Sequence, residues 1–190
     1  FDAVNHAFAT MATGGFSPEG GSVGDYGSAY VDWVITAFMF LAGMNFALHF
    51  RLLRGKAITV FYDTELRAYA AVTAIATLFI TIATWRPLGV TLTPDAAFAG
   101  YETLAEALRY AAFQSTAIIT TTGFGTADYE LWPPLAIVTV FLLFFCGGMA
   151  GSTGGGIKII RHVLLFKNSF KEIRQLVHPR AIIPTRLNNT

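Results

Sequence analysis

Three long runs without a charged residue constrain this chain more than any other feature of its sequence. They cover residues 33–50, 68–85 and 131–157. A run of about 18 apolar residues is long enough to cross the roughly 30 Å hydrocarbon core of a bilayer. One such run could be a buried helix of a soluble protein, but three in 190 residues are poorly explained that way. Only 13% of the residues are charged, about half the share in a soluble domain. We therefore predict an all-α integral membrane protein.

The distribution of charge predicts which ends of these runs face the cytoplasm. Lysine and arginine gather in residues 51–67 and 158–190, whereas most acidic residues lie in the other connections. Cytoplasmic loops carry the basic excess, so we expect the acidic loops outside. Trp33, Trp85 and Trp132 then lie at the outer ends of the runs, where interfacial aromatic residues occur. A net charge of +1 argues against a nucleic-acid partner, because no basic excess is available to neutralise phosphates.

Two further segments have both ends on the predicted outer side, so they must enter the membrane and return by the same face. Residues 3–18 and 103–120 each lead from an apolar stretch into a threonine- and glycine-rich sequence. These sequences are TGGFSP and TTTGFGTADY. We expect re-entrant loops, each a short helix followed by an extended return strand. Irregular backbone at membrane depth is tolerated only where protein buries it or where it lines a water-filled path.

The two loops belong to an internal repeat. Residues 13–17 align with residues 121–125 at an offset of 108 (Thr13 on Thr121), and residues 40–44 align with residues 145–149 further along. The repeating unit is an outer helix, a re-entrant pore helix with its filter loop, and an inner helix. The first unit lacks its outer helix, and the chain opens without methionine, so we expect a fragment of a longer protein. The expected organisation is a first unit over residues 1–56, a cytoplasmic linker over 57–67, a complete unit over 68–177 and a cytoplasmic tail over 178–190.

Such loops suit an ion path lined by oxygen atoms. The C-terminal end of a helix carries a partial negative charge that favours a cation, and carbonyl oxygens can replace the water shell of a dehydrated ion. Gly15 and Gly123 can supply the backbone angles that align successive carbonyls, and threonine hydroxyls can add ligands. Hard oxygen donors favour an alkali cation over a transition metal. The predicted filter residues are Thr13, Gly14, Gly15, Phe16, Thr121, Thr122, Gly123, Phe124 and Gly125. The expected K⁺ ligands among them are Thr13, Gly14, Gly15, Thr121, Thr122 and Gly123.

These motifs resemble the selectivity loops of the Trk/Ktr/HKT potassium transporter superfamily, particularly its TrkH-type membrane subunits. The sequences TGGFS, TTTGFGTADY and GGMAGSTGGGIKIIRH carry the resemblance, which extends over essentially the whole chain. It implies the second and third of four pore repeats, and K⁺ uptake across the bacterial cytoplasmic (inner) membrane rather than an enzymatic activity. K⁺ would be the transported ion, with no organic cofactor in this chain. The implied partners are membrane lipid, the remaining repeats of the polypeptide, a second copy in a homodimer, and a cytosolic RCK-type nucleotide-binding regulatory subunit of the TrkA/KtrA class.

A glycine-rich segment, GGMAGSTGGGIK, interrupts the last apolar run. Each glycine costs a helix about 1 kcal/mol relative to alanine, so a regular helix is not expected there. The resemblance implies an intramembrane gate beneath the filter, whereas close helix packing through small residues is the alternative. A phosphate-binding loop would need Gly-Lys-Ser/Thr, but the order here is Gly-Ile-Lys-Ile. The predicted gate residues are Gly147, Gly148, Gly151, Ser152, Thr153, Gly154, Gly155 and Gly156.

Three other functions remain as alternatives to K⁺ transport. The first is a Na⁺-permeable relative of the same family, the second is a membrane-bound nucleotide-using enzyme, and the third is a structural membrane anchor. An anchor would have no need of threonine–glycine loops that enter from the outer face.

Some isolated polar residues have simpler interpretations. His6 is expected to be a hydrogen-bonded packing residue rather than a proton shuttle, and Asn45 and His49 are expected to bond to each other or to a neighbour. Lys158 favours cytoplasmic anchoring, although a positive barrier at the inner mouth of the pore or a contact with a regulator is the alternative; the same holds for Arg161. The single cysteine, Cys146, excludes an internal disulfide and is expected to be an inert, buried small hydrophobe.

Overall fold

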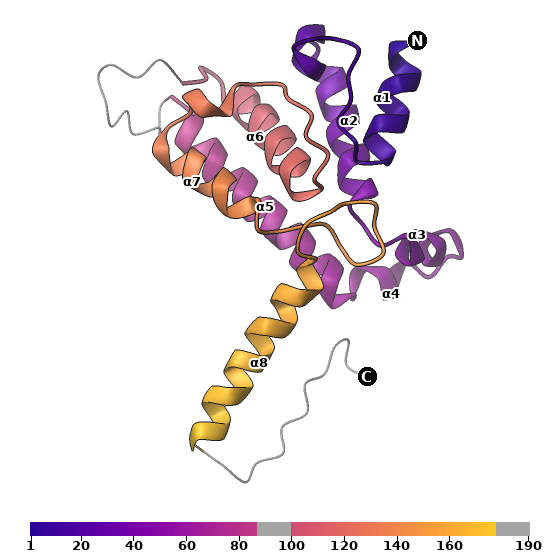
Figure 1. Cartoon of the computed structure of the whole chain (residues 1–190), viewed down its shortest axis with the longest axis vertical. Coiled ribbons are helices and arrows are strands. Elements are labelled where there is room, and N and C mark those ends of the chain that lie inside the picture. Colours follow the sequence, from indigo (N-terminus) through magenta and orange to yellow (C-terminus); the bar gives the residue numbers. More distant parts are fainter. Residues whose placement is uncertain (87–99, 178–190) are drawn as a thin grey trace.

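The computed structural model describes residues 1–86 and 100–177, which form eight α-helices, two short 3-10 helices and their connecting loops (Figure 1). Within these ranges the only strand-like feature is an isolated bridge between Trp85 and Tyr101. The predicted tail over residues 178–190 lies outside the described residues, as does the acidic loop around Asp95.

The first unit begins with helix α1 (Asp2–Met11) and continues through a 3-10 helix (Ser22–Tyr26) to helix α2 (Ala29–Ala42). Helix α2 packs against α1 on one side and against α6 of the second unit on the other. Helices α3 (Phe46–Leu53) and α4 (Ala57–Phe61) then lead toward the second unit.

The expected continuous span over residues 33–50 was wrong. Helices α2 and α3 meet at 101° after a break of three residues. A side chain at Gly43 would overlap the Tyr69 hydroxyl and lie 2.7 Å from the Thr120 Cγ2 atom, so the chain comes very close to its neighbours here. Asn45 then starts α3 by accepting a hydrogen bond from the N–H of Ala47 (2.8 Å), which satisfies one of the donors that a helix start leaves unpaired.

The second unit is a group of three helices. Helix α5 (Thr64–Thr84) contains residues 68–84 of the run expected at 68–85 as one uninterrupted helix, and Trp85 is its C-cap. It starts earlier than the run because the Asp63 side chain accepts a hydrogen bond from the N–H of Leu66 (3.0 Å). Helix α6 (Leu104–Ile119) and helix α7 (Pro134–Leu143) both pack against α5. A hydrogen bond between the hydroxyls of Thr77 and Ser115 (2.6 Å) joins α5 to α6.

Helix α7 is shorter than the run over residues 131–157 suggested. It ends at Leu143, before the first glycine, because the chain already turns there: the N–H of Cys146 donates to the carbonyl of Leu143 (2.9 Å). Among the described helices, α5 is the one long and apolar enough to cross a membrane. The bent pair α2–α3 would be a second only if its two helices formed one span.

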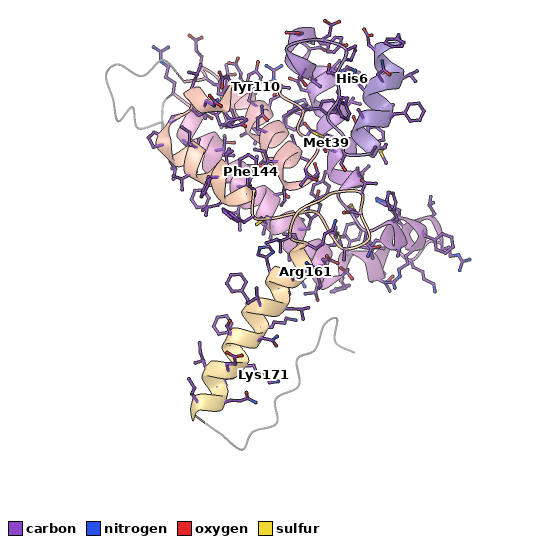
Figure 2. All side chains as sticks on the ribbon, viewed as in Figure 1. His6, Met39, Tyr110, Phe144, Arg161 and Lys171 are labelled. Atoms are coloured by element: carbon purple, nitrogen blue, oxygen red, sulfur yellow. The ribbon has the colours of Figure 1, made fainter. Side chains whose placement is uncertain are left out.

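Helix α8 (Ile159–Val177) extends away from the other helices (Figure 1). Figure 2 shows basic side chains along it, with Arg161 close to the other helices and Lys171 toward the far end. The protein core consists of two clusters. The larger surrounds Tyr69 of the second unit and also contains Met44 and Leu48 of the first unit. The smaller joins the two units through Val23, Ile35, Met39, Phe113, Ala117 and Phe124.

Candidate functional site

Helix α6 ends in a Schellman motif in which threonine is the left-handed residue. The N–H of Thr122 donates to the carbonyl of Ala117 (2.9 Å), and the N–H of Thr121 donates to the carbonyl of Ile118 (2.9 Å). Thr121 has a φ of 58°, a conformation that glycine usually supplies at this position. For an ordinary L residue it costs about 1–2 kcal/mol. Strain of this kind persists only where the surroundings impose it, and it concentrates at functional sites.

Helix α1 ends in the same way, 108 residues earlier. The N–H of Gly14 donates to the carbonyl of Ala9 (2.8 Å), and the N–H of Thr13 donates to the carbonyl of Thr10 (3.1 Å). Thr13 has a φ of 52°. The two units therefore share an unusual backbone conformation as well as a sequence motif.

Left-handed backbone returns two residues further on in both loops. Gly15 has a φ of 66° and Gly123 a φ of 82°, whereas the intervening Gly14 and Thr122 have no positive φ. Glycine is the residue that adopts this conformation without steric cost. Two of the predicted filter glycines thus occupy positions where the backbone requires them.

The two loops meet backbone to backbone. A Cβ atom on Gly15 would overlap the carbonyl oxygen of Thr122 and lie 3.2 Å from the carbonyl carbon of Gly123. The structure therefore brings together the K⁺ ligands predicted from the two units. The predicted filter residue Gly125 has a further role: its N–H donates to the Ser22 hydroxyl (3.2 Å), and its carbonyl accepts from the N–H of Gly24 (3.0 Å). It fastens the second return strand to the first unit.

The two phenylalanines among the predicted filter residues have opposite environments. Phe124 is 2% exposed and packs in the cluster between the units, where its ring stacks on His6 at a centroid distance of 5.5 Å. Phe16, the equivalent residue of the first unit, is 81% exposed. The side chain of Phe124 thus joins the second loop to the first unit.

His6 and Gln114 hold the two return strands to their pore helices. The Nε2 atom of His6 lies 3.1 Å from the Ser17 hydroxyl, and its Nδ1 atom lies 2.8 Å from the Asp2 carbonyl oxygen. This confirms the interpretation of His6 as a hydrogen-bonded packing residue. Gln114 is 2% exposed and donates to the carbonyl of Ala127 (2.9 Å). Sequence analysis missed Gln114, although the offset of 108 places it on His6.

A buried ion pair joins the two units beside the loops. The guanidinium of Arg109 on α6 lies 3.5 Å from the carboxylate of Asp32 on α2, and the two side chains are 16% and 6% exposed. The same guanidinium lies 4.5 Å from the ring centroid of Tyr110. Opposite charges from neighbouring units therefore fix the relative position of α2 and α6.

The segment between α7 and α8, which we call the glycine loop (residues 144–158), lies against the C-terminal ends of α1 and α6, the two predicted pore helices. The N–H of Gly155 donates to the Thr121 hydroxyl (2.6 Å), and the Thr153 hydroxyl donates to the carbonyl of Met11 (3.1 Å). A side chain at Gly154 would lie 2.8 Å from the carbonyl oxygen of Thr120. The predicted gate residues all lie in this loop: Gly147, Gly148, Gly151, Ser152, Thr153, Gly154, Gly155 and Gly156.

The glycine loop does not form a phosphate cradle. Such a cradle needs several backbone N–H groups that point at the ligand. Here the N–H groups of Gly147, Met149, Ser152 and Gly155 donate to oxygen atoms of the protein itself. The N–H of Ala150 donates to the carboxylate of Glu65 (2.7 Å), and this acidic group would repel a phosphate.

Oxygen atoms of carbonyl and hydroxyl groups dominate the site. Within residues 1–86 and 100–177, no group of three or more histidine, cysteine or acidic residues could hold a metal ion. The hydroxyls of Thr120 and Thr122 bond to each other (2.7 Å) at the end of α6. Neutral oxygen donors of this kind match an alkali cation better than a transition metal.

Comparisons with known proteins identify the family of this chain. A family profile described as "TrkH: Cation transport protein" matches residues 1–189. The chain is 37% identical to the Trk system potassium uptake protein TrkH of Halomonas elongata over 98% of its length, and 37% identical to that of Salmonella typhimurium over all of it. It spans only 36–37% of the length of these relatives. The crystal structure of the potassium transporter TrkH from Vibrio parahaemolyticus superposes with a TM-score of 0.84 at 32% identity, covering 98% of this chain and 38% of that one.

Proposed function

The chain belongs to the TrkH family of cation transport proteins, and we propose that it forms part of a K⁺ uptake path across the bacterial cytoplasmic membrane. The contact between the two loops, backbone to backbone at Gly15, carries this proposal. Two equivalent loops that meet without side chains between them can present carbonyl oxygens to one shared ion. Carbonyl oxygens arranged in this way replace the hydration shell of a dehydrated cation.

The helix ends favour a cation at the same place. Helices α1 and α6 both end at the loops, at Met11 and Ile119. The last carbonyl groups of a helix carry a partial negative charge of about half an elementary charge. Two such ends beside one path would stabilise a monovalent cation without the help of a carboxylate. A full negative charge from a carboxylate would hold the ion too tightly for rapid release.

The glycine loop is proposed to act as the gate on this path. It contacts the C-terminal ends of both pore helices through Thr153 and Gly155. In this arrangement it lies between the filter loops and α8, where it would obstruct ions that leave the filter. Opening would require the loop to give up these hydrogen bonds.

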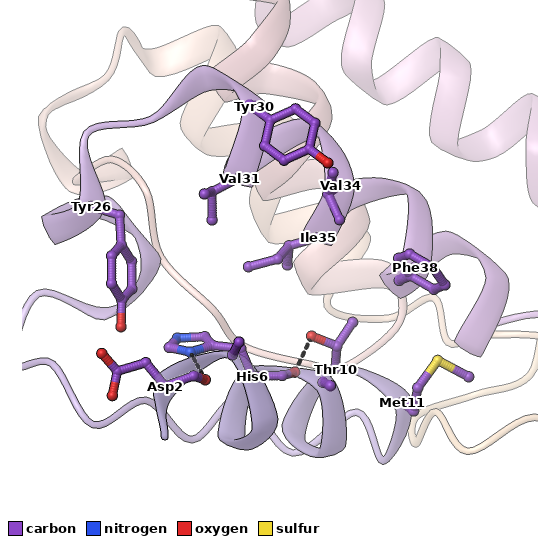
Figure 3. Close-up of a pocket in the computed structure, with 12 residues that line it drawn as sticks. Asp2, His6, Thr10, Met11, Tyr26, Tyr30, Val31, Val34, Ile35 and Phe38 are labelled. Atoms are coloured by element: carbon purple, nitrogen blue, oxygen red, sulfur yellow. Dashed lines mark hydrogen bonds between the residues drawn. The ribbon is translucent and has the colours of Figure 1, made fainter.

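The rest of the polypeptide is proposed to complete the path, and a cavity in the first unit supports this. The cavity lies between α1 and α2 (Figure 3) and measures about 510 Å³. Ala7 is one of the residues that line it. The offset of 108 places Ala7 on Ser115, which the outer helix α5 covers through Thr77. The cavity thus lies where an outer helix would cover the first unit. The exposed Phe16 also supports a preceding unit. Phe124 of the second unit packs against the first unit, and Phe16 of the first unit would pack in the same way against the unit that precedes it.

Helix α8 is proposed to contact a cytosolic regulatory subunit of the RCK type, and the complete protein is proposed to form a homodimer in lipid. The support for the first point is that α8 extends from the helices and carries Arg161, Lys167, Lys171 and Arg174 (Figure 2). A basic helix in this position suits an acidic surface of a partner in the cytoplasm.

The first test is Gly123→Ser in the full-length protein. Uptake of rubidium and sodium tracers would be measured in cells that lack other potassium uptake, at matched membrane expression. Gly55→Ser is the matched control, because Gly55 has a φ of 75° and Gly123 a φ of 82°, and neither has an atom within 4 Å of an added Cβ. We expect Gly123→Ser to abolish rubidium uptake or to admit sodium, and Gly55→Ser to change neither. Unchanged selectivity in Gly123→Ser would refute the role of the loops as a filter.

A further inference from the structure

The glycine loop is held from one side by a buried carboxylate that belongs to neither the filter nor the loop. Glu65 is the second residue of α5 and is 8% exposed. Its Oε1 atom accepts a hydrogen bond from the N–H of Ala150 (2.7 Å), which is 85 residues away in the glycine loop. The carboxylate also accepts from the backbone N–H of Ile160, in the first turn of α8. One side chain therefore binds both the middle of the loop and the helix that follows it.

A lysine at the end of the glycine loop makes a charged contact within the loop itself. The Nζ atom of Lys158 donates to the carbonyl of Gly154. Partial burial lowers the pKa of this ammonium group, and attraction to the Glu65 carboxylate opposes that shift. The carboxylate thus holds an N–H of the loop while the ammonium holds a carbonyl, and each charge has the other nearby.

Both of these contacts involve a side chain that carries a charge when ionised. Hydrogen bonds with one ionised partner are roughly twice as strong as neutral ones, whereas Thr153 and Gly155 make only neutral bonds to the pore helices. A segment rich in glycine has many backbone conformations available, so its position depends on what fastens it. Loss of the carboxylate would leave the N–H of Ala150 unpaired and Lys158 without its counter-charge.

We propose that Glu65 is a positioning residue that holds the glycine loop against the ends of the two pore helices and so limits basal ion flux. The proposal rests on the gate described above and names the residue that sets its resting position. Ions do not touch Glu65. Its effect passes through Ala150 and the first turn of α8, and it favours the arrangement in which the loop lies beside Thr121.

The test compares Glu65→Ala and Glu65→Gln with Glu172→Ala in the full-length protein. Glu172 is an exposed carboxylate on α8 and is the matched control. The first readout is the rate of rubidium uptake. The second is the rate at which a charged thiol reagent, applied from the cytoplasmic side, modifies Ser152→Cys in a protein whose other cysteines are replaced. The second readout follows the loop itself and does not depend on transport.

We expect Glu65→Ala to raise both rates about tenfold, because a charge-assisted bond is worth at least a factor of ten in an equilibrium. Glu65→Gln should raise them less, since its amide oxygen can still accept from Ala150, and Glu172→Ala should change neither. If Glu65→Ala fails to assemble, the modification rate in Glu65→Gln tests the proposal instead, because glutamine keeps the shape of the side chain. An unchanged modification rate in an assembled Glu65 variant would overturn the inference.

The outcomes separate this inference from the proposed function. If Glu65→Ala speeds modification of Ser152→Cys while Gly123→Ser leaves selectivity intact, the fastening role of Glu65 is supported and the filter proposal fails. If Gly123→Ser changes selectivity while neither Glu65 variant changes the modification rate, the filter proposal holds and the role of Glu65 is refuted.

Discussion

A single methyl group added at Gly15 should force the two filter loops apart. In Gly15→Ala the new Cβ atom would overlap the carbonyl oxygen of Thr122 and lie 3.0 Å from its carbonyl carbon. Both atoms belong to backbone, which cannot rotate away as the end of a flexible side chain could. The position also has a φ of 66°, which alanine adopts only at a cost.

The expected loss of stability has two parts. The left-handed conformation costs about 1–2 kcal/mol for an L residue, and overpacking a closely packed site costs about 1–3 kcal/mol. Together they give about 2–5 kcal/mol for Gly15→Ala. Gly27→Ala is the matched control, because Gly27 has a φ of 55° but no atom within 4 Å of an added Cβ. It should lose only the first part, about 1–2 kcal/mol.

The assay is the half-life of the folded, full-length protein in detergent at a fixed elevated temperature, since large membrane proteins commonly unfold irreversibly. Tracer uptake of rubidium and sodium would be measured in parallel. Gly15→Ala should shorten the half-life more than Gly27→Ala does, and it alone should reduce the preference for rubidium. Equal half-lives with unchanged selectivity would show that the close contact between the loops is not needed.

Substitutions at Arg109 and Gln114 test two further contacts. Arg109→Ala should cost about 3–5 kcal/mol, because it leaves the buried carboxylate of Asp32 unpaired. Arg86→Ala breaks an exposed pair with Glu102 and should cost at most about 1 kcal/mol; equal half-lives of the two variants in the same thermal assay would contradict this reasoning. Gln114→Leu removes the donor to the Ala127 carbonyl and should cost about 1–3 kcal/mol. It should also weaken ion selectivity in the same uptake assay.

The sequence predicted best those features that one segment determines by itself. Helix α5 follows from a single uncharged run, and the Asp63 cap that starts it lies next to that run. The equivalent loop conformations follow from the repeat, because Gly15 and Gly123 mark positions where the backbone requires glycine. In each of these cases the residues that determine the conformation lie within the segment itself.

The bend between α2 and α3 could not be predicted from the local sequence. The run over residues 33–50 is uniformly apolar, and hydropathy reports how apolar a segment is but not whether it is straight. Gly43 alone does not require a break. The close approach of Tyr69 and Thr120, from the second unit, leaves no room for a side chain there. Helix α7 likewise ends before its glycines, where the chain turns at Cys146, and Gly147 then pairs with Ile157 across the loop (2.8 Å).

Thr13 and Thr121 could not be predicted as left-handed residues, because a β-branched residue with positive φ is an outlier whose cause lies in its surroundings. Gly155 supplies part of that cause for Thr121 by donating to its hydroxyl. The same difficulty applies to the residues that hold the irregular segments in place. Gln114 is one of these residues, and aligning the two units at the offset of 108 places it on His6, so comparing the two units could have identified it. Glu65 has no counterpart within the chain and lies 85 residues from the N–H that it binds, so only the folded structure connects it to the glycine loop.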